Sequence, residues 1–405
     1  MLSSRDELNR PFPGKRIYGW LAFGSLLVTL CGSTPSALYP LYQKNFIFPS
    51  WMLTVVFAVF ISGIIAALLV IQVLDRINQR HILVIASAIS IVGATMFLAS
   101  NSLTWLLGAS FVQGIGVGLY QSTVNAVLVK MVSEEQYPRA TLASSRMGTI
   151  GLAAGPLIAG LLAEYAPAPL RLIYLIELLF LLPLLAVILL TSSESNYRRS
   201  DHVTENGEQY SGWRTVPIIL LFITVFLSFA SGAFLNAIGS TILVTWLDVN
   251  SLAVGGMAVT LLFGSSAITQ SWVTKHNPVI VMCIGLIFAA AGLFANAIAV
   301  GMASSVLVLA SVIVVGSGQG CAYAGSLALL NITVPGKRLA AMTSRYYLAA
   351  YVGAAVPSLA GGWAIAQFGA TPAVLLFACW ISVPAVALIL LVSKTSNRAS
   401  PPHAG

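Results

Sequence analysis

Long apolar stretches separated by short polar connections dominate this sequence. A helix needs about 20 mostly apolar residues to cross the hydrocarbon core of a bilayer, and twelve stretches have that length. The predicted spans are residues 18–42, 50–73, 81–100, 103–130, 140–164, 171–191, 215–246, 250–273, 278–300, 304–331, 339–366 and 371–393. The pattern therefore predicts an all-α polytopic membrane protein with twelve transmembrane helices.

One connection is longer and more polar than the others. It covers residues 192–214, which are rich in charged residues and include glycine, and it separates six spans from six. This predicts an N-terminal six-helix bundle at 1–191, a central cytoplasmic linker at 192–214 and a C-terminal six-helix bundle at 215–405.

Composition excludes a soluble protein. The chain is 58% hydrophobic and 8% charged, whereas soluble domains are about 25% charged. In a membrane protein, the formal net charge of +8 indicates which loops lie on the cytoplasmic side. It does not indicate nucleic-acid binding. Scattered cysteines and histidines give no disulfide framework and no metal site, and neither an enzyme's catalytic constellation nor a cofactor is predicted.

Basic residues fix the expected orientation, because loops on the cytoplasmic side are enriched in Lys and Arg. With the N-terminus inside, the outer loops contain only Lys44 and Arg171. The cytoplasmic segments collect Arg5, Arg10, Lys15, Arg16, Arg76, Arg80, Lys130, Arg139, Arg198, Arg199, Arg214, Lys275, Lys337, Arg338, Lys394 and Arg398. Both termini are therefore expected in the cytoplasm.

The two halves contain a repeated segment. "RATLASSRMGTIGLAAGPLIAG" in span five recurs as "RLAAMTSRYYLAAYVGAAVPSLAGG" in span eleven, which matches Arg146 with Arg345 and Pro156 with Pro357. "VQGIGVG" in span four is echoed by "GQGCAYAG" in span ten. Duplicated halves are typical of transporters, and a non-transporting receptor is the weaker alternative. The repeat predicts pseudo-twofold symmetry, with Arg146 and Arg345 on opposite sides of a central path.

The six-plus-six spans and two motifs resemble the major facilitator superfamily of transporters. The loop "IQVLDRINQRHIL" matches its signature G-x-L-a-D-R-x-G-R-R/K at Asp75, Arg76 and Arg80, and departs from it at Ile71, Asn78 and Gln79. Span five is similar to the G-x-x-x-G-P-x-x-G-G pattern of the drug-antiporter branch, with Gly151, Gly155, Pro156 and Gly160 in place. Ser110 stands where many members of that branch have an arginine.

Each motif suits a mechanical role. Asp75 is expected to dock on the N-terminal dipole of a helix in the other half and latch the inner gate; the alternative is a solvated loop whose charges only set topology. The glycine row permits close helix approach and Pro156 permits bending. Static close packing and a moving hinge are both left open.

Glu177 is the acidic residue that lies well within a span, about 9 Å of helix rise from Arg171. An uncompensated carboxylate at that depth favours its protonated form, so Glu177 is predicted to face the cavity and to carry the coupling proton. The alternative is a structural role, paired with an arginine or at the lipid edge.

Arg146 and Arg345 allow two interpretations. They form either an anion clamp for a carboxylate or phosphate, or gate residues, with Arg345 as a partner for Asp75. The gate is favoured because both residues lie nearer the inner mouth than the midplane, where substrate sites usually lie.

Polar and aromatic residues at helical spacing predict the wall of a binding cavity. They are Ser36, Tyr39, Gln113, Tyr120, Asn236, Ser240, Gln319, Tyr323 and Ser326. Hydrogen bonding between helices, without substrate contact, is the alternative for any one of them.

No phosphate-binding loop is present, so an ion gradient is the expected energy source. The sequence predicts a monomeric secondary active transporter in a bacterial-type inner membrane. The leading hypothesis is proton-coupled export of small amphipathic, drug-like or metabolic compounds. The alternative is a symporter or exchanger of a small organic anion or sugar.

Overall fold

The structure is a computed structural model that describes residues 15–73, 77–131, 137–190, 216–334 and 336–397. The N-terminal half comprises α2 (Lys15–Ser33), α3 (Pro35–Phe46), α4 (Met52–Val73), α5 (Gln79–Leu98), α6 (Leu103–Lys130), α7 (Tyr137–Tyr165) and α8 (Leu172–Leu190). The C-terminal half comprises α9 (Ile218–Thr241) with the π-helical turn η2 (Ile242–Trp246), α10 (Leu252–Gln270) with the 3-10 turn η3 (Ser271–Thr274), α11 (Pro278–Gly301), α12 (Ser305–Thr333), α13 (Gly336–Phe368) and α14 (Ala370–Asn397).

The predicted twelve-span, all-α architecture is confirmed. Twelve helical segments are long and apolar enough to cross a membrane, and the described residues include no strand. Predicted and observed ends differ by at most four residues, at Phe46 and Asn397. The predicted linker at 192–214 lies outside the described residues.

The first span consists of two helices. α2 ends at Ser33 and α3 begins at Pro35, because proline has no N–H to continue the helical hydrogen bonds. The Thr34 N–H still donates to the Leu30 carbonyl at 2.9 Å, so the chain continues in nearly the same direction. The break places polar side chains in the middle of an otherwise apolar span.

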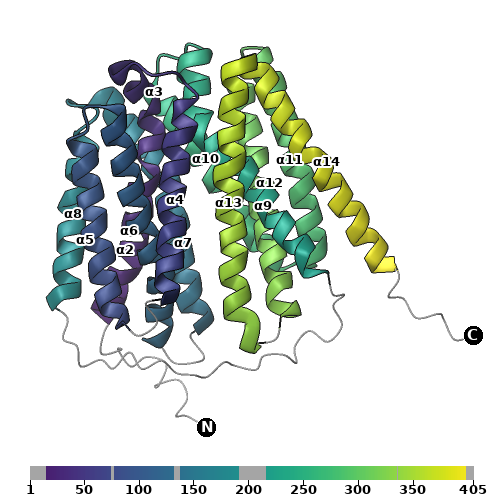
Figure 1. The fold of residues 1–405 in the computed structure, drawn as a ribbon, viewed down its shortest axis with the longest axis horizontal. Coiled ribbons are helices and arrows are strands. Elements are labelled where there is room, and N and C mark those ends of the chain that lie inside the picture. The colour runs from purple at the N-terminus through teal and green to yellow at the C-terminus, as the bar shows by residue number, and fades with distance from the viewer. Residues whose placement is uncertain (1–14, 74–76, 132–136, 191–215, 335, 398–405) are drawn as a thin grey trace, which may run out of the picture.

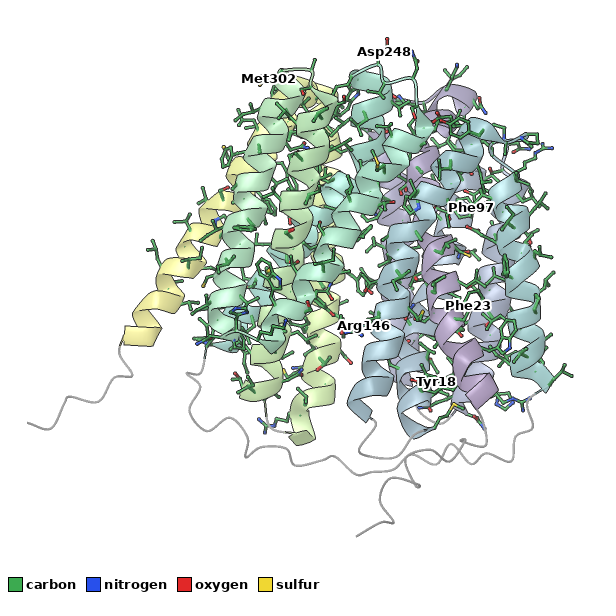
Figure 2. The ribbon with its side chains drawn as sticks, turned by 180° about the vertical axis from the view of Figure 1, so that it is seen from behind. Tyr18, Phe23, Phe97, Arg146, Asp248 and Met302 are labelled. Atoms are coloured by element: carbon green, nitrogen blue, oxygen red, sulfur yellow. The ribbon has the colours of Figure 1, made fainter. Side chains whose placement is uncertain are left out.

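The two halves lie side by side (Figure 1). We call the end at which α2 begins and α14 ends the termini end, and the opposite end the far end. The halves meet at the far end and separate toward the termini end (Figure 2).

Glycines bring helices together inside each half. Gly114 of α6 lies against the Phe60 carbonyl oxygen of α4, and Gly316 of α12 lies against the Leu262 carbonyl oxygen of α10. A Cβ at either glycine would collide with backbone. Close packing is therefore the role of "GIGVG" and "GSGQG", and the two segments are structural equivalents.

This equivalence corrects the register of the repeat in spans four and ten. The residue numbers of Gly114 and Gly316 differ by 202, so Gln113 corresponds to Val315 and not to Gln319. Their contacts agree, since Gly93 of α5 lies against Gln113 and Gly292 of α11 lies against Val315. The sequence match had shifted the register by about one helical turn.

The same register relates α7 to α13. Gly151 lies against the Leu26 carbonyl oxygen and Gly353 against that of Phe226, again 202 residues apart. Arg146 therefore corresponds to Leu348. Arg345 lies three residues earlier, which turns it by about 60° on a helix with 3.6 residues per turn. The predicted match of Arg146 with Arg345 in the repeat is therefore wrong.

The glycine contacts predict a position-specific effect on stability. In Gly318→Ala, the new Cβ would collide with the backbone of Ala289 and Gly285, and overpacking of this kind costs about 1–3 kcal/mol. We expect the thermal unfolding midpoint of the purified protein to fall by several degrees. The matched control is Gly264→Ala, which meets nothing within 4 Å and is expected to leave the midpoint unchanged or slightly raised. Equal midpoints for the two variants would contradict the packing role.

Candidate functional site

The two halves are joined at the far end by close contact between α7 and α10. Gly256 of α10 lies against the Pro156 carbonyl oxygen, and Gly160 of α7 lies against the backbone of Leu252. The Thr260 hydroxyl donates to the Ala153 carbonyl oxygen at 2.6 Å. Backbones can approach this closely only where one partner has no side chain.

The glycines and the proline of the span-five motif in α7 therefore contact two different helices. Gly151 and Gly155 lie against the carbonyl oxygens of Leu26 and Leu30 in α2, within the same half. Pro156 and Gly160 contact α10 in the other half. The row holds α7 to its own bundle on one face and forms the contact between the halves on another.

Glu164, which was not among the predicted site residues, extends this contact. Its carboxylate accepts a hydrogen bond from the Ser251 hydroxyl at 2.6 Å and one from the Ala253 N–H at 2.9 Å. Both donors lie at the N-terminus of α10, where the helix dipole also favours a negative charge. The sequence does show Ser251 as a possible N-cap before span eight. A single sequence gives no sign, however, that Ser251 lies next to Glu164 of span five.

A second contact between the halves lies at the same end. Gly362 of α13 lies against the Thr54 side chain of α4, and Thr54 is fully buried. The pairs α7 with α10 and α4 with α13 therefore cross between the halves at the far end, and α3 also contacts α9 and α10.

Arg146 lies between the halves (Figure 2). It is two turns before Ala153 and four turns before Gly160, so it shares the face of α7 that contacts α10. The side chain is nevertheless exposed, and no residue in the described part of the chain gives its guanidinium a hydrogen bond or ion pair.

A half-buried aromatic cluster lies at the same depth in the C-terminal half. The ring centroid of Phe229 in α9 is 5.6 Å from that of Tyr323 in α12 and 6.0 Å from that of Tyr351 in α13. The hydroxyl oxygens of Tyr323 and Tyr347 are 3.2 Å apart. Arg146 corresponds to Leu348, which lies between Tyr347 and Tyr351, so the arginine and the cluster lie at similar depths in the two halves. We treat them together as the candidate site.

Glu177 lies inside the N-terminal half and not, as predicted, on the face between the halves. It is 1% exposed and contacts Cys31 and Thr34 at the α2–α3 break. The Thr34 hydroxyl donates to the Leu30 carbonyl oxygen, and neither carboxylate oxygen has a hydrogen-bond partner within the described ranges.

Two tyrosines complete the surroundings of Glu177. The Tyr42 hydroxyl donates to that of Tyr174 at 2.9 Å, and Tyr174 stacks on Phe97 of α5. Thus α8 and the broken first span enclose an unpaired carboxyl group in a wall of hydroxyl, thiol and aromatic groups.

The loop motif between α4 and α5 is described in part. Arg80 donates to the carbonyl oxygens of Ile188 and Leu189 at 3.1 and 2.7 Å, which satisfies the C-terminus of α8 in the same half. Asp75 and Arg76 lie outside the described residues, and so does any latch that they form.

Most of the predicted cavity wall is occupied by packing. Tyr120 donates to the Leu21 carbonyl oxygen, Ser240 to that of Gly255, and Ser326 bonds to the Tyr346 hydroxyl. Ser36, Tyr39, Gln113, Asn236 and Gln319 are also buried. Of the nine residues, Tyr323 is half-buried and belongs to the candidate site. Amide atoms of Gln113, Asn236 and Gln319 lack partners among the described residues.

The sequence profile described as Major Facilitator Superfamily matches residues 21–294. Curated relatives include the putative multidrug resistance protein MdtD of Cronobacter sakazakii, 29% identical over 31% of this chain and 25% of the relative. The MdtD protein of Escherichia coli O6:H1 is 31% identical over the same shares. The chain thus matches about a quarter of the length of these relatives.

Solved structures share the fold over nearly the whole chain. A bacterial homologue of the human lysosomal transporter Spinster, inward-facing and unoccupied, has a TM-score of 0.75 at 14% identity and covers 96% of this chain and 98% of that one. A mutant of the nucleoside transporter NupG has a TM-score of 0.70 at 16% identity, with 92% and 99% covered.

The Glu164 contact predicts a change in far-end accessibility. Thr54→Cys, in a background whose native cysteines are alanine, reports opening of the far end because Thr54 is buried at the second contact between the halves, that of α4 with α13. Glu164→Ala removes two charge-assisted hydrogen bonds of about 1.5–3 kcal/mol each in buried settings. Since Glu164 is only half-buried, we expect a smaller effect, a several-fold faster labelling by a membrane-impermeant maleimide.

The control for this experiment is Asp248→Asn, which removes an exposed carboxylate at the same end. We expect it to label at the parent rate. Glu164→Ala labelling no faster than Asp248→Asn would show that Glu164 does not hold the far end closed.

Proposed function

Because this chain belongs to the Major Facilitator Superfamily and is a transporter rather than an enzyme, we propose that it exports small amphipathic compounds by alternating access in exchange for protons. The observation that carries the proposal is the candidate site. An exposed arginine of the N-terminal half and an aromatic cluster of the C-terminal half lie at similar depths, and the two halves are joined at the far end.

We place the termini end in the cytoplasm of a bacterial-type inner membrane. The positive-inside distribution of Lys and Arg supports this orientation. In this orientation the halves separate toward the cytoplasm, which supports a state that receives substrate from that side. Release outside requires the Glu164 contact to break and the cytoplasmic ends to close, for which Asp75 stays the proposed latch.

The chemistry of the site supports an amphipathic substrate. Phe229 and the three tyrosines offer ring faces and hydroxyl groups, which suit aromatic compounds with a few polar atoms. The relatives named as putative multidrug resistance proteins agree with export, although they match over about a quarter of their length.

Glu177 is the proposed proton carrier. A buried carboxylate without a partner is costly as an anion, so in this state the group is held neutral. Its position at the α2–α3 break allows loss of the proton to be transmitted to the first span. α3 contacts α9 and α10 of the other half, which connects the carboxyl group to the contact between the halves.

A small organic anion is the second candidate substrate, and Arg146 favours it. The guanidinium is exposed toward the C-terminal half and would attract a carboxylate or phosphate. In this alternative the protein works as a symporter or an exchanger, and the tyrosines bind the organic part of the anion.

The first prediction concerns substrate class. In a host deficient in efflux, expression is expected to lower accumulation of at least one aromatic amphipathic compound, and a proton uncoupler to abolish that effect. Tyr351→Ala should raise accumulation several-fold by removing ring contacts. The matched control is Phe288→Ala, an exposed ring on α11, which should behave as the parent protein.

The same cells separate the two candidates. If cells that express the protein take up a labelled aromatic carboxylate, and cells that express Arg146→Gln do not, the organic-anion alternative replaces export. If no compound shows an uncoupler-sensitive change in accumulation, the export proposal fails.

The second prediction concerns coupling. Glu177→Gln keeps a neutral polar group of similar size but cannot release a proton, so gradient-driven transport by reconstituted protein should be lost. Counterflow exchange, which needs no net proton movement, should persist. Asp248→Asn serves as the control with both activities intact. Gradient-driven transport that survives in Glu177→Gln would remove this residue from coupling.

A further inference from the structure

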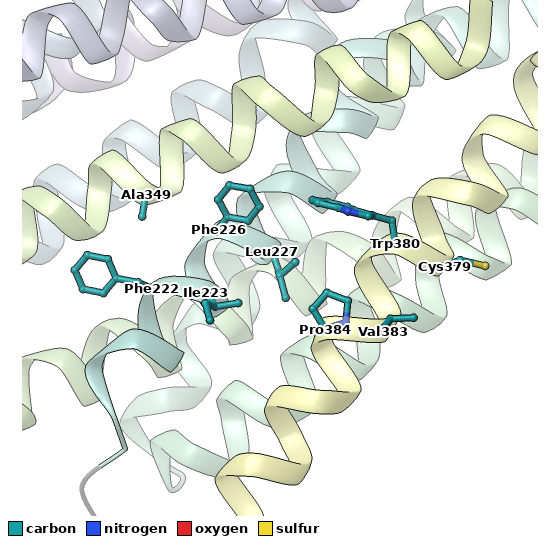
Figure 3. Close-up of a pocket in the computed structure, with 9 residues that line it drawn as sticks. All are labelled: Phe222, Ile223, Phe226, Leu227, Ala349, Cys379, Trp380, Val383 and Pro384. Carbon is teal, nitrogen blue, oxygen red and sulfur yellow. The ribbon is translucent and has the colours of Figure 1, made fainter. Parts of the chain in front are cut away.

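An apolar groove opens between α9, α13 and α14 on the outer surface of the C-terminal half (Figure 3). Its volume is about 870 Å³, within the range of about 300–1,000 Å³ typical of small-molecule sites. Phe222 and Phe226 of α9 line one side, Trp380 and Pro384 of α14 line another, and Ala349 of α13 completes the lining. The rings of Phe226 and Trp380 meet edge to face, with centroids 6.3 Å apart. The groove lies toward the termini end, where α14 diverges from α9 and α13 (Figure 1).

Arg345 lies at the mouth of this groove. It is one turn before Ala349, and the side chains of a helix tilt toward its N-terminus, which for α13 is the termini end. Its neighbour Tyr346 packs edge-to-face on Phe222, with ring centroids 6.1 Å apart. Arg345 is exposed, with no hydrogen bond or ion pair from the residues that the structure describes.

Arg345 also shares the membrane-facing stripe of α13. Trp363, five turns later on the same face, is 60% exposed, and Val356 is 56% exposed. Arg338, about two turns earlier on this stripe, is exposed as well. The stripe thus runs from two cations near the termini end to apolar side chains in the membrane.

The depth of Arg345 fits the boundary between lipid headgroups and hydrocarbon. The apolar span of α13 is Ala341–Phe368, so Arg345 lies four residues, or about 6 Å of rise, inside it. Each interfacial layer of a bilayer is about 5–8 Å thick. A long arginine side chain at this depth reaches the phosphates.

We propose that this groove is a binding site for an anionic glycerophospholipid of the leaflet at the termini end. One acyl chain lies in the groove against Phe222, Phe226 and Pro384, and the phosphate binds Arg345, with Arg338 as the second cation. Charge complementarity selects this occupant: α9, α13 and α14 contain no acidic residue, so nothing on these helices compensates the two arginines. Basic sites between helices near the membrane surface are suited to anionic headgroups.

The test uses the purified full-length protein in detergent micelles doped with phosphatidylglycerol or phosphatidylcholine of identical acyl chains. Phosphatidylglycerol is expected to raise the thermal unfolding midpoint by several degrees more than phosphatidylcholine. The double variant Arg338→Gln and Arg345→Gln should lose this difference. The control Arg171→Gln, an exposed arginine at the far end, should keep it. Equal midpoints with the two lipids in the parent protein would overturn the proposal.

A second measurement locates the lipid. In a variant that keeps Trp380 and replaces the other tryptophans by phenylalanine, lipid brominated on its acyl chains quenches the fluorescence of a contacting indole. Brominated phosphatidylglycerol should quench at a several-fold lower mole fraction than brominated phosphatidylcholine, and Ala349→Phe should weaken the quenching. Equal quenching by the two lipids would contradict a selective site. Relief of quenching by a transported amphipathic compound would assign the groove to substrate instead.

Discussion

The close approach of α7 and α10 is the contact on which the rest of the arrangement depends. Gly256 against Pro156 and Gly160 against Leu252 let two backbones meet without intervening side chains. Apolar side chains give little preference for helix contact over lipid contact in a membrane, so this surface relies on close packing and a few hydrogen bonds. Thr260 and Glu164 supply those bonds. A surface of this kind can separate without exposing a large apolar core.

The contact also sets where the candidate site lies. Because the halves are held at the far end, they diverge toward the termini end, and Arg146 lies between them (Figure 2). The polar side chains near the contact are mostly buried, whereas the half-buried aromatic cluster lies beyond it. The contact between α7 and α10 therefore has two consequences: it closes the far end, and it leaves the halves separated toward the termini end.

The sequence predicted the architecture well because apolar length is a direct physical requirement of the bilayer. The twelve spans needed only corrections of a few residues at their ends. The repeat was also real, but its register was wrong in both pairs of spans. Matching Gln113 to Gln319 and Arg146 to Arg345 aligned similar letters, whereas the backbone contacts align glycines. A shift of three residues is enough to move Arg345 from the central face to the membrane face.

Individual site residues were harder to predict, because hydropathy does not show which face of a buried helix meets which neighbour. Glu177 was identified as an acid within a span, but its enclosure by α8 and the broken first span follows from packing. Glu164 was not identified, since its partners at Ser251 and Ala253 are distant in sequence. Arg80 donates hydrogen bonds to backbone carbonyl oxygens at the C-terminus of α8. Any residue type offers such a carbonyl, so the sequence does not reveal this contact.

A disulfide across the far end tests the central claim, that transport requires this contact to open. Cysteines at Thr54 and Gly362 would lie close enough to form one, because a Cβ on Gly362 meets the Thr54 side chain. Transport by the reconstituted double variant is the measurement. We predict that oxidation abolishes transport and that reduction restores it, while each single variant is unaffected by oxidation. Full transport by the cross-linked protein would contradict the account.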